Sequence, residues 1–121
     1  MGSGPPGPPE APLTQYEIWW ASLPAPAGRR PVLLLTRPRG YAYLSRILVA
    51  EVTTTVRGIA QEVSLGSPEG LPRGCVANFD NTQAIPRRWL AKRIGRLSPE
   101  RVVEAKRALG HALAWHELTG L

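Results

Sequence analysis

Between Tyr16 and Ile85 the chain is a succession of short apolar runs, rich in β-branched and aromatic residues and separated by proline, glycine and polar turns. Such runs are typical of β-strands. They lie at residues 16–23, 29–37, 45–56, 59–65 and 75–85. The second run, RRPVLLLTR, stays apolar between its arginines, which predicts a central strand buried on both faces. No helical pattern alternates with the runs, so a parallel sheet is not expected.

The fifth run is interrupted by the polar residues Asn78, Asp80 and Asn81. We expect a bend or a bulge at this point of the strand. The segment that follows it, RRWLAKRIG at 87–95, predicts a short helical turn.

A second helix is predicted near the end of the chain. Ser98, Pro99 and Glu100 supply a cap, a first residue of fixed φ and an early acid in the order that begins a helix. This helix should run to near Trp115 or Leu118. Strands followed by helices indicate an α+β domain, a small and strongly bent antiparallel β-barrel with a short helix and a C-terminal helix.

The chain has 121 residues, enough for one compact domain. We assign residues 15–121 to this domain and residues 1–14, rich in proline and glycine, to a disordered tail. Neither a secretory signal pattern nor an apolar run of membrane-spanning length is visible, so we expect a cytoplasmic protein with no membrane association. The single cysteine, Cys75, can form neither an internal disulfide nor a four-thiolate zinc site. We expect no metal site and no cofactor.

The charge balance favours a polyanionic partner. Lys and Arg total 15 against 9 Asp and Glu, for a formal net charge of +6. All but two of these cations are Arg, whose forked guanidinium suits phosphate binding. RNA, DNA and an acidic protein all fit this composition.

Several motifs stand in the order and approximate spacing of a known family. They are EIWW at 17–20, GRRPVLLLT at 28–36, LVAEVTTTVRG at 48–58, EVSLG at 62–66, GLPRGCVANFDNTQAIPRR at 70–88 and RIGRLSPERVVEAKRAL at 93–109. With them the chain resembles the MazF/PemK toxins from Tyr16 to Leu113. The resemblance implies an SH3-like barrel of the CcdB, Kid and MazF type and a homodimer. It also implies cleavage of single-stranded RNA, with messenger RNA as the expected target, in a groove at the twofold interface, and an acidic antitoxin whose flexible tail occupies that groove.

The resemblance also implies two catalytic residues. The family's arginine precedes the Pro-Val of the second strand and matches Arg30, and its threonine ends the third strand and matches Thr53. A bulge that shifts the register would put Thr54 or Thr55 in place of Thr53. Other side chains are expected to bind RNA: Arg29, Arg37, Arg39, Tyr41, Thr54, Arg57 and Gln83.

The reaction implied by the resemblance is an internal transfer in which a ribose 2′-hydroxyl attacks the adjacent phosphate and expels the 5′-oxygen. Its products are a 2′,3′-cyclic phosphate and a 5′-hydroxyl. Negative charge gathers on the nonbridging oxygens, and a guanidinium with a hydroxyl donor stabilises that charge without a metal. Arg30 and Thr53 fit these roles.

The proton acceptor of this reaction is unassigned by the sequence. Arg is a poor general base, because its pKa exceeds about 12. Many family members carry a glutamate in the loop before the arginine, whereas no acid lies between Trp20 and Arg30 here. Three candidates for the proton acceptor stay open: Glu17, a water molecule and a residue of the partner subunit. Reduced activity is a further alternative.

The missing loop glutamate keeps other functions open. One is a noncatalytic barrel that binds RNA or, like CcdB, a topoisomerase subunit. Another is a degenerate toxin that binds antitoxin and leaves cells unharmed.

Overall fold

The computed structural model describes residues 12–121. Most of the predicted tail, residues 1–11, lies outside the described part. Of the remainder, Leu13 is buried in the core and the Thr14 amide donates to the Glu17 carboxylate at 3.1 Å. Leu13 and Thr14 therefore contact the residues of the domain. No helix within residues 12–121 is long and apolar enough to span a membrane.

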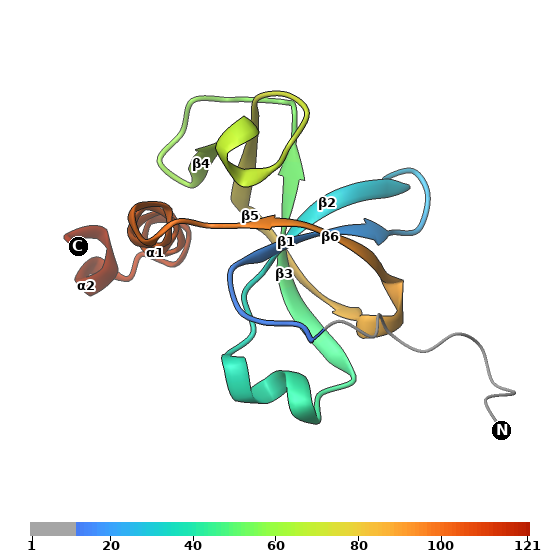
Figure 1. Ribbon diagram of the computed structural model, residues 1–121. Helices are drawn as coiled ribbons and strands as arrows, with labels where there is room; N and C mark the ends of the chain where they lie inside the picture. Colours follow the sequence, from blue (N-terminus) through green and yellow to red (C-terminus); the bar gives the residue numbers. More distant parts are fainter. Residues whose placement is uncertain (1–11) are drawn as a thin grey trace, which may run out of the picture.

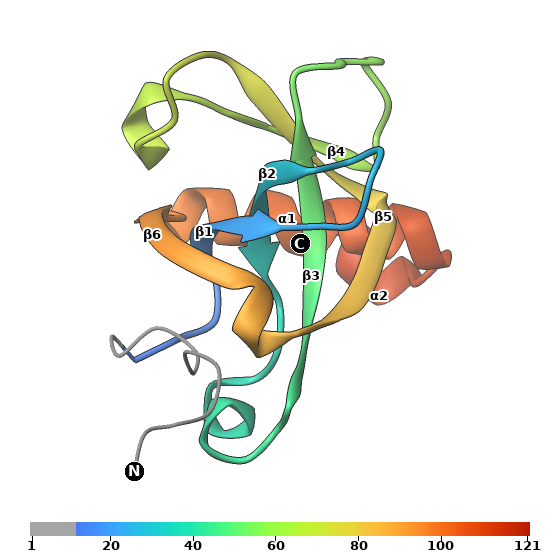
Figure 2. The same cartoon turned by 90° about the vertical axis from the view of Figure 1, so that its right-hand side faces the viewer.

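The core of the fold is one antiparallel sheet of six strands in the order β4-β5-β3-β2-β1-β6. Its strands are β1 (Glu17–Ser22), β2 (Arg29–Leu34), β3 (Arg46–Thr53), β4 (Glu62–Leu65), β5 (Cys75–Pro86) and β6 (Leu90–Arg96). Short 3-10 turns connect some of them: η1 (Pro38–Ala42), η2 (Ser67–Glu69) and η3 (Arg87–Trp89). The sheet is strongly curled, as a half-barrel (Figures 1 and 2). The predicted bent antiparallel α+β fold is confirmed.

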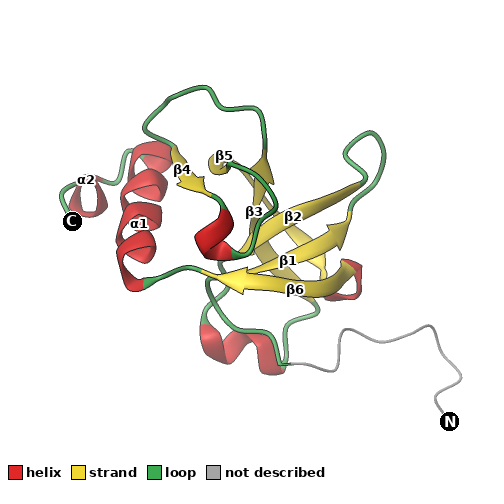
Figure 3. Ribbon diagram, turned by 45° about the horizontal axis from the view of Figure 1, so that its top comes forward, coloured by secondary structure: helices red, strands yellow, loops and turns green. Residues whose placement is uncertain are grey.

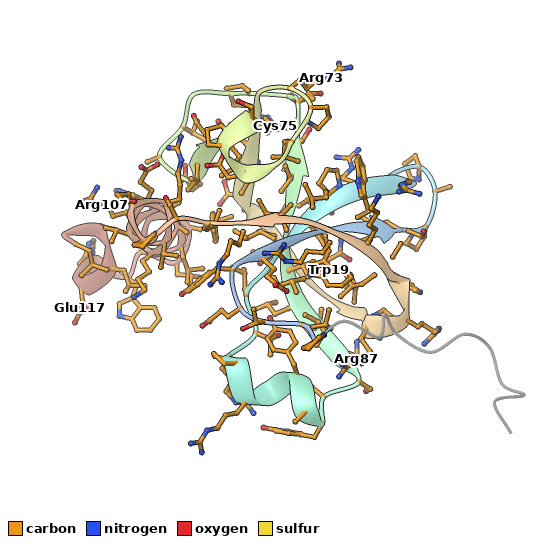
Figure 4. The ribbon with its side chains drawn as sticks, viewed as in Figure 1. Trp19, Arg73, Cys75, Arg87, Arg107 and Glu117 are labelled. Carbon is orange, nitrogen blue, oxygen red and sulfur yellow. The ribbon has the colours of Figure 1, made fainter. Side chains whose placement is uncertain are left out.

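Both faces of the central strands are buried. In β2, Leu33 belongs to one buried apolar cluster, whereas Val32 and Leu34 belong to another. The alternation of side chains along a strand explains this division. Trp19 of β1, 1% exposed, lies at the centre of the second cluster (Figure 4). An uninterrupted apolar run in the sequence is what a strand with two buried faces requires.

The predicted irregularity in β5 is confirmed. Ala50 of β3 pairs with Thr82, but the next residue, Glu51, pairs with Asn78. The additional residues therefore lie in β5, and β3 stays regular to its last residue, Thr53, which pairs with Val76. The register of the threonines is not shifted by the bulge.

The prediction of a helical turn over residues 87–95 is wrong for most of its length. Only η3 is helical, and the remainder forms β6 at the edge of the sheet, paired with β1. Local sequence is ambiguous here because basic residues alternate with apolar ones. The free edge of β1 decides the conformation, since Trp19 pairs with Arg93 and Trp20 with Lys92.

The predicted C-terminal helix is confirmed as α1 (Pro99–Leu113), and a short helix, α2 (His116–Thr119), follows it. The Ser98 hydroxyl accepts from the Arg101 amide at 3.2 Å, as a capping residue does. Ala105 and Ala108 are buried in the first apolar cluster with residues of β4 and β5. Helix α1 therefore covers one face of the sheet (Figure 3). Among the described residues, none of α1 belongs to the second cluster.

Candidate active site at the ends of β2 and β3

The candidate site continues the sheet face that α1 does not cover. On this face Val32 of β2 and Val49 of β3 are buried. Side-chain alternation puts Arg30 and Glu51 on the same face. The recorded pairing of β2 with β3 ends with Val32 opposite Glu51, and Arg30 and Thr53 each lie two residues beyond this pair on their own strands. Where the apolar face ends, polar and charged side chains therefore meet.

Three neighbouring strands contribute side chains that contact one another. The Arg30 guanidinium of β2 lies 3.7 Å from Oε1 of Glu51 in β3. The Gln83 amide of β5 donates to Oε2 of Glu51 at 2.8 Å. The side chains of Arg30 and Glu51 are 32% and 20% exposed, so the pair is held in place and still open to a ligand. The predicted residues Arg30 and Gln83 are thus joined through Glu51.

Thr53 has a hydroxyl hydrogen available for a ligand. Its Oγ1 accepts from the Thr55 backbone amide at 3.1 Å, which orients the oxygen in the turn after β3. A hydroxyl that accepts one hydrogen bond can still donate its own hydrogen. The side chain is half-buried at the rim of a cavity. Thr53 can therefore act as a donor toward an anionic group near Arg30.

The cavity beside Thr53 measures about 220 Å³. Trp20, Pro31 and Pro72 form apolar parts of its wall, and Thr54 and Arg73 also line it. The guanidinium carbon of Arg29 lies 5.0 Å from the centre of the Trp20 ring. Arg29 and Trp20 thus combine a cation with an aromatic surface, as sites that bind single-stranded nucleic acid do.

Cys75 also lines this cavity but is not a candidate nucleophile. The thiol is 7% exposed and donates to the Arg73 carbonyl at 3.1 Å. Burial raises the pKa of the Cys75 thiol, although the charge of Arg73 lowers it. A thiol in this state is unreactive at neutral pH. Figure 4 shows both residues at the end of the molecule near η2.

The other predicted RNA-binding residues are divided between two ends of the sheet. Thr54 lies at the cavity, and Arg57 follows in the exposed loop between β3 and β4. Arg37 and Arg39 instead lie at η1, beyond the opposite end of β2 (Figure 1, blue-green turn). The structure therefore does not bring these two arginines to the Arg30 cluster.

The predicted RNA-binding residue Tyr41 lies in the core and not at the surface. Tyr41 is 6% exposed and packs in the second apolar cluster. Burial raises the pKa of its phenol. The turn η1 folds back so that Tyr41 covers the core while Tyr43 stays exposed.

Glu17, one of the open choices for the general base, is occupied elsewhere. It is buried, and its carboxylate accepts from the Trp19 indole at 3.1 Å and from Arg93 at 2.8 Å. Glu51, by contrast, was not predicted as a site residue. The sequence feature that could have indicated Glu51 is its position two residues before Thr53, because residues two apart in a strand have side chains on the same face. Within residues 12–121 no group of three or more His, Cys, Asp or Glu side chains is placed to hold a metal ion.

Comparison with known proteins identifies the family. The model of the "PemK-like, MazF-like toxin of type II toxin-antitoxin system" matches residues 14–113. The chain belongs to this toxin family. A probable endoribonuclease MazF2 of Mycobacterium tuberculosis is 42% identical over 98 residues, 80% of this chain and 94% of the relative. A second relative from that species, the probable endoribonuclease MazF5, is 42% identical over 71% of this chain and 79% of its own length.

Solved toxin structures agree with this assignment. The M. tuberculosis toxin MazF-mt6 has a TM-score of 0.76 at 39% identity, and the match covers 81% of this chain and 96% of that one. An endoribonuclease from a mycobacterial species, solved with its cognate antitoxin, has a TM-score of 0.76 at 23% identity and supports the shared fold. The Arg30 cluster of this MazF-like toxin lies within the matched residues.

Proposed function

We propose that this MazF-like toxin is a metal-independent, sequence-specific endoribonuclease that cleaves single-stranded RNA. The observation that carries the proposal is the cluster of Arg30, Glu51 and Gln83, with Thr53 two residues beyond Glu51 at the end of β3. A guanidinium and a free hydroxyl hydrogen on one rigid sheet are the donors that a charged phosphate needs in the transition state. Relatives named endoribonucleases are 42% identical to it over the matched residues.

The proposed reaction is attack of the ribose 2′-oxygen on the adjacent phosphorus. Arg30 binds the nonbridging oxygens and neutralises the charge that they gain, and Thr53 donates to the same group. The bond from phosphorus to the 5′-oxygen breaks, leaving 2′,3′-cyclic phosphate and 5′-hydroxyl ends. A growth experiment tests this role in cells: expression of the wild type arrests growth, and the Thr53→Ala variant, made in equal amount, does not.

We propose that the Trp20 cavity holds a base of the bound RNA. Stacking of a base on an aromatic side chain contributes about 1–3 kcal/mol. Trp20→Ala should therefore raise KM for a short RNA by about 5- to 150-fold and leave kcat within a factor of a few. Steady-state cleavage kinetics measure both constants. Trp115→Ala is the matched control, because Trp115 is 50% exposed on the C-terminal segment. Equal KM values for wild type and Trp20→Ala would contradict the proposal that this cavity binds a base.

We further propose a homodimer and an acidic antitoxin as partners. Leu48 and Leu113 are 44% and 60% exposed and line an apolar cavity of about 290 Å³ with Leu109. Such exposed apolar surface favours a protein contact, and a second copy of the chain would cover it. Light scattering should then give twice the 13.2 kDa of one chain. The net charge of +6 favours an antitoxin with an acidic segment.

A further inference from the structure

The proposed reaction leaves one chemical task without a residue. The 2′-hydroxyl must lose its proton as it attacks, and neither catalytic candidate accepts it. Arg30 is a cation with no acceptor, and the Thr53 hydroxyl already accepts from the Thr55 amide. A positioned carboxylate or imidazole is the usual acceptor in such a step.

Glu51 is the carboxylate placed for this task. It comes two residues before Thr53 in β3 and lies 3.7 Å from the Arg30 guanidinium. The contact to Arg30 is longer than a hydrogen bond, so Arg30 keeps its donors for a phosphate. The two carboxylate oxygens differ: Oε2 accepts from Gln83 at 2.8 Å, while Oε1 has only the longer contact to Arg30. Oε1 therefore has lone pairs free to accept a proton.

The other carboxylates of the described residues are engaged elsewhere or lie away from the cluster. Glu17 accepts from Trp19 and Arg93. Glu62 accepts from the backbone amides that close the loop between β3 and β4. Glu69 is buried at η2 and accepts from the Gly66 amide. The remaining acids are exposed in the β5 bulge or belong to the helices: Asp80, Glu100, Glu104 and Glu117.

We propose that Glu51 is the proton acceptor of the cleavage reaction, an inference that rests on the proposed ribonuclease function. Oε1 takes the proton of the 2′-hydroxyl while the oxygen forms its bond to phosphorus. The electron pair of the breaking bond leaves on the 5′-oxygen, which takes a proton from solvent. Glu51 then releases its proton to solvent before the next cycle. No water or redox partner is consumed, since the cyclic phosphate and 5′-hydroxyl together carry the atoms of the substrate.

The arrangement explains how the chain manages without an acid in the loop before Arg30. The carboxylate is supplied by the neighbouring strand instead. A rigid central strand fixes Glu51 more closely than a loop does. The groups that face its carboxylate are Arg30 from β2 and Gln83 from β5. The hydrogen bond from Gln83 fixes the rotamer of this carboxylate.

The test compares Glu51→Gln with Asp80→Asn in the full chain, using a short RNA with one cleavage site. Both changes remove one negative charge, but Asp80 lies exposed in the β5 bulge. Glu51→Gln should lower kcat about 10²- to 10⁴-fold, the usual contribution of a general base. KM should stay level or fall, because a charge that repels RNA is removed. Asp80→Asn should stay within about twofold of the wild type.

The pH profile separates a proton acceptor from a residue that only positions Arg30. The pH profile of the rate should differ in shape between the wild type and Glu51→Gln, because only the wild type has a carboxylate that accepts the proton. RNA binding and thermal unfolding of Glu51→Gln show that the variant is folded. A profile of wild-type shape in Glu51→Gln would overturn the proposal, as would an unchanged kcat.

The failure of this inference differs from the failure of the proposed function. If the wild type cleaves, Arg30→Ala does not and Glu51→Gln keeps its kcat, then Glu51 alone loses its role. If the wild type leaves RNA intact, both the proposed ribonuclease function and the inference about Glu51 are contradicted.

Discussion

Arg30→Ala should cleave RNA about 10³- to 10⁵-fold more slowly than the wild type, the range found for arginines that stabilise a transferring phosphoryl group. Arg30 bears a permanent charge on a rigid strand beside the proposed phosphate site. Its removal takes away the transition-state cation and leaves Glu51 without its partner at 3.7 Å. The loss should appear in kcat, because the interaction strengthens as charge develops. Single-turnover cleavage of a defined RNA measures it directly.

Arg29→Ala is the matched control for this experiment. The two arginines are neighbours in β2, but Arg29 lies over the Trp20 ring and not beside Glu51. Its loss should weaken RNA binding and leave the chemical step nearly unchanged. If the single-turnover rate constants of Arg29→Ala and Arg30→Ala fall by the same factor at saturating enzyme, Arg30 has no role in the chemical step.

Trp19→Ala should lower the free energy of unfolding by about 3–5 kcal/mol, as expected when a large buried aromatic side chain is truncated. Trp19 is 1% exposed, and its indole donates to Glu17 at 3.1 Å. The variant loses this bond and opens a cavity in the second apolar cluster, beneath the face that carries Arg30. The free energy of unfolding of small domains is about 5–15 kcal/mol, so this change would remove much of it. Urea denaturation, followed by circular dichroism, measures the change.

Trp19→Phe separates the two causes, since it keeps most of the packing and loses the indole donor. Its cost should be smaller than that of alanine. Trp115→Ala should cost little, because half of that side chain is exposed. A Trp19→Ala protein as stable as Trp115→Ala would contradict the central position of Trp19 in the core.

The features predicted well from the sequence are those that local pattern determines. The apolar run of β2 has buried side chains on both faces, and such a strand has no other stable place than the middle of a sheet. The polar interruption at Asn78 marked the bulge in β5. Ser98 capped α1 as its sequence predicted. In each case neighbouring residues carry the whole signal.

The features that were missed depend on contacts distant in the sequence. Strand β6 forms because the edge of β1, some 70 residues earlier, offers hydrogen bonds to Arg93 and its neighbours. Tyr41 turns inward because η1 folds over the end of the sheet. Glu51 joins the site only when β2 and β5 pair on either side of β3, which brings Arg30 and Gln83 to its carboxylate. No local motif records these pairings.

The most direct test of the proposed function is a cleavage assay on a long single-stranded RNA in the presence of a chelator, with the fragment ends mapped. We predict cuts at short specific motifs that leave 2′,3′-cyclic phosphate and 5′-hydroxyl ends, and loss of these cuts in both Arg30→Ala and Thr53→Ala. Intact RNA after incubation with folded wild-type protein would contradict the ribonuclease function and favour a barrel that only binds its partner.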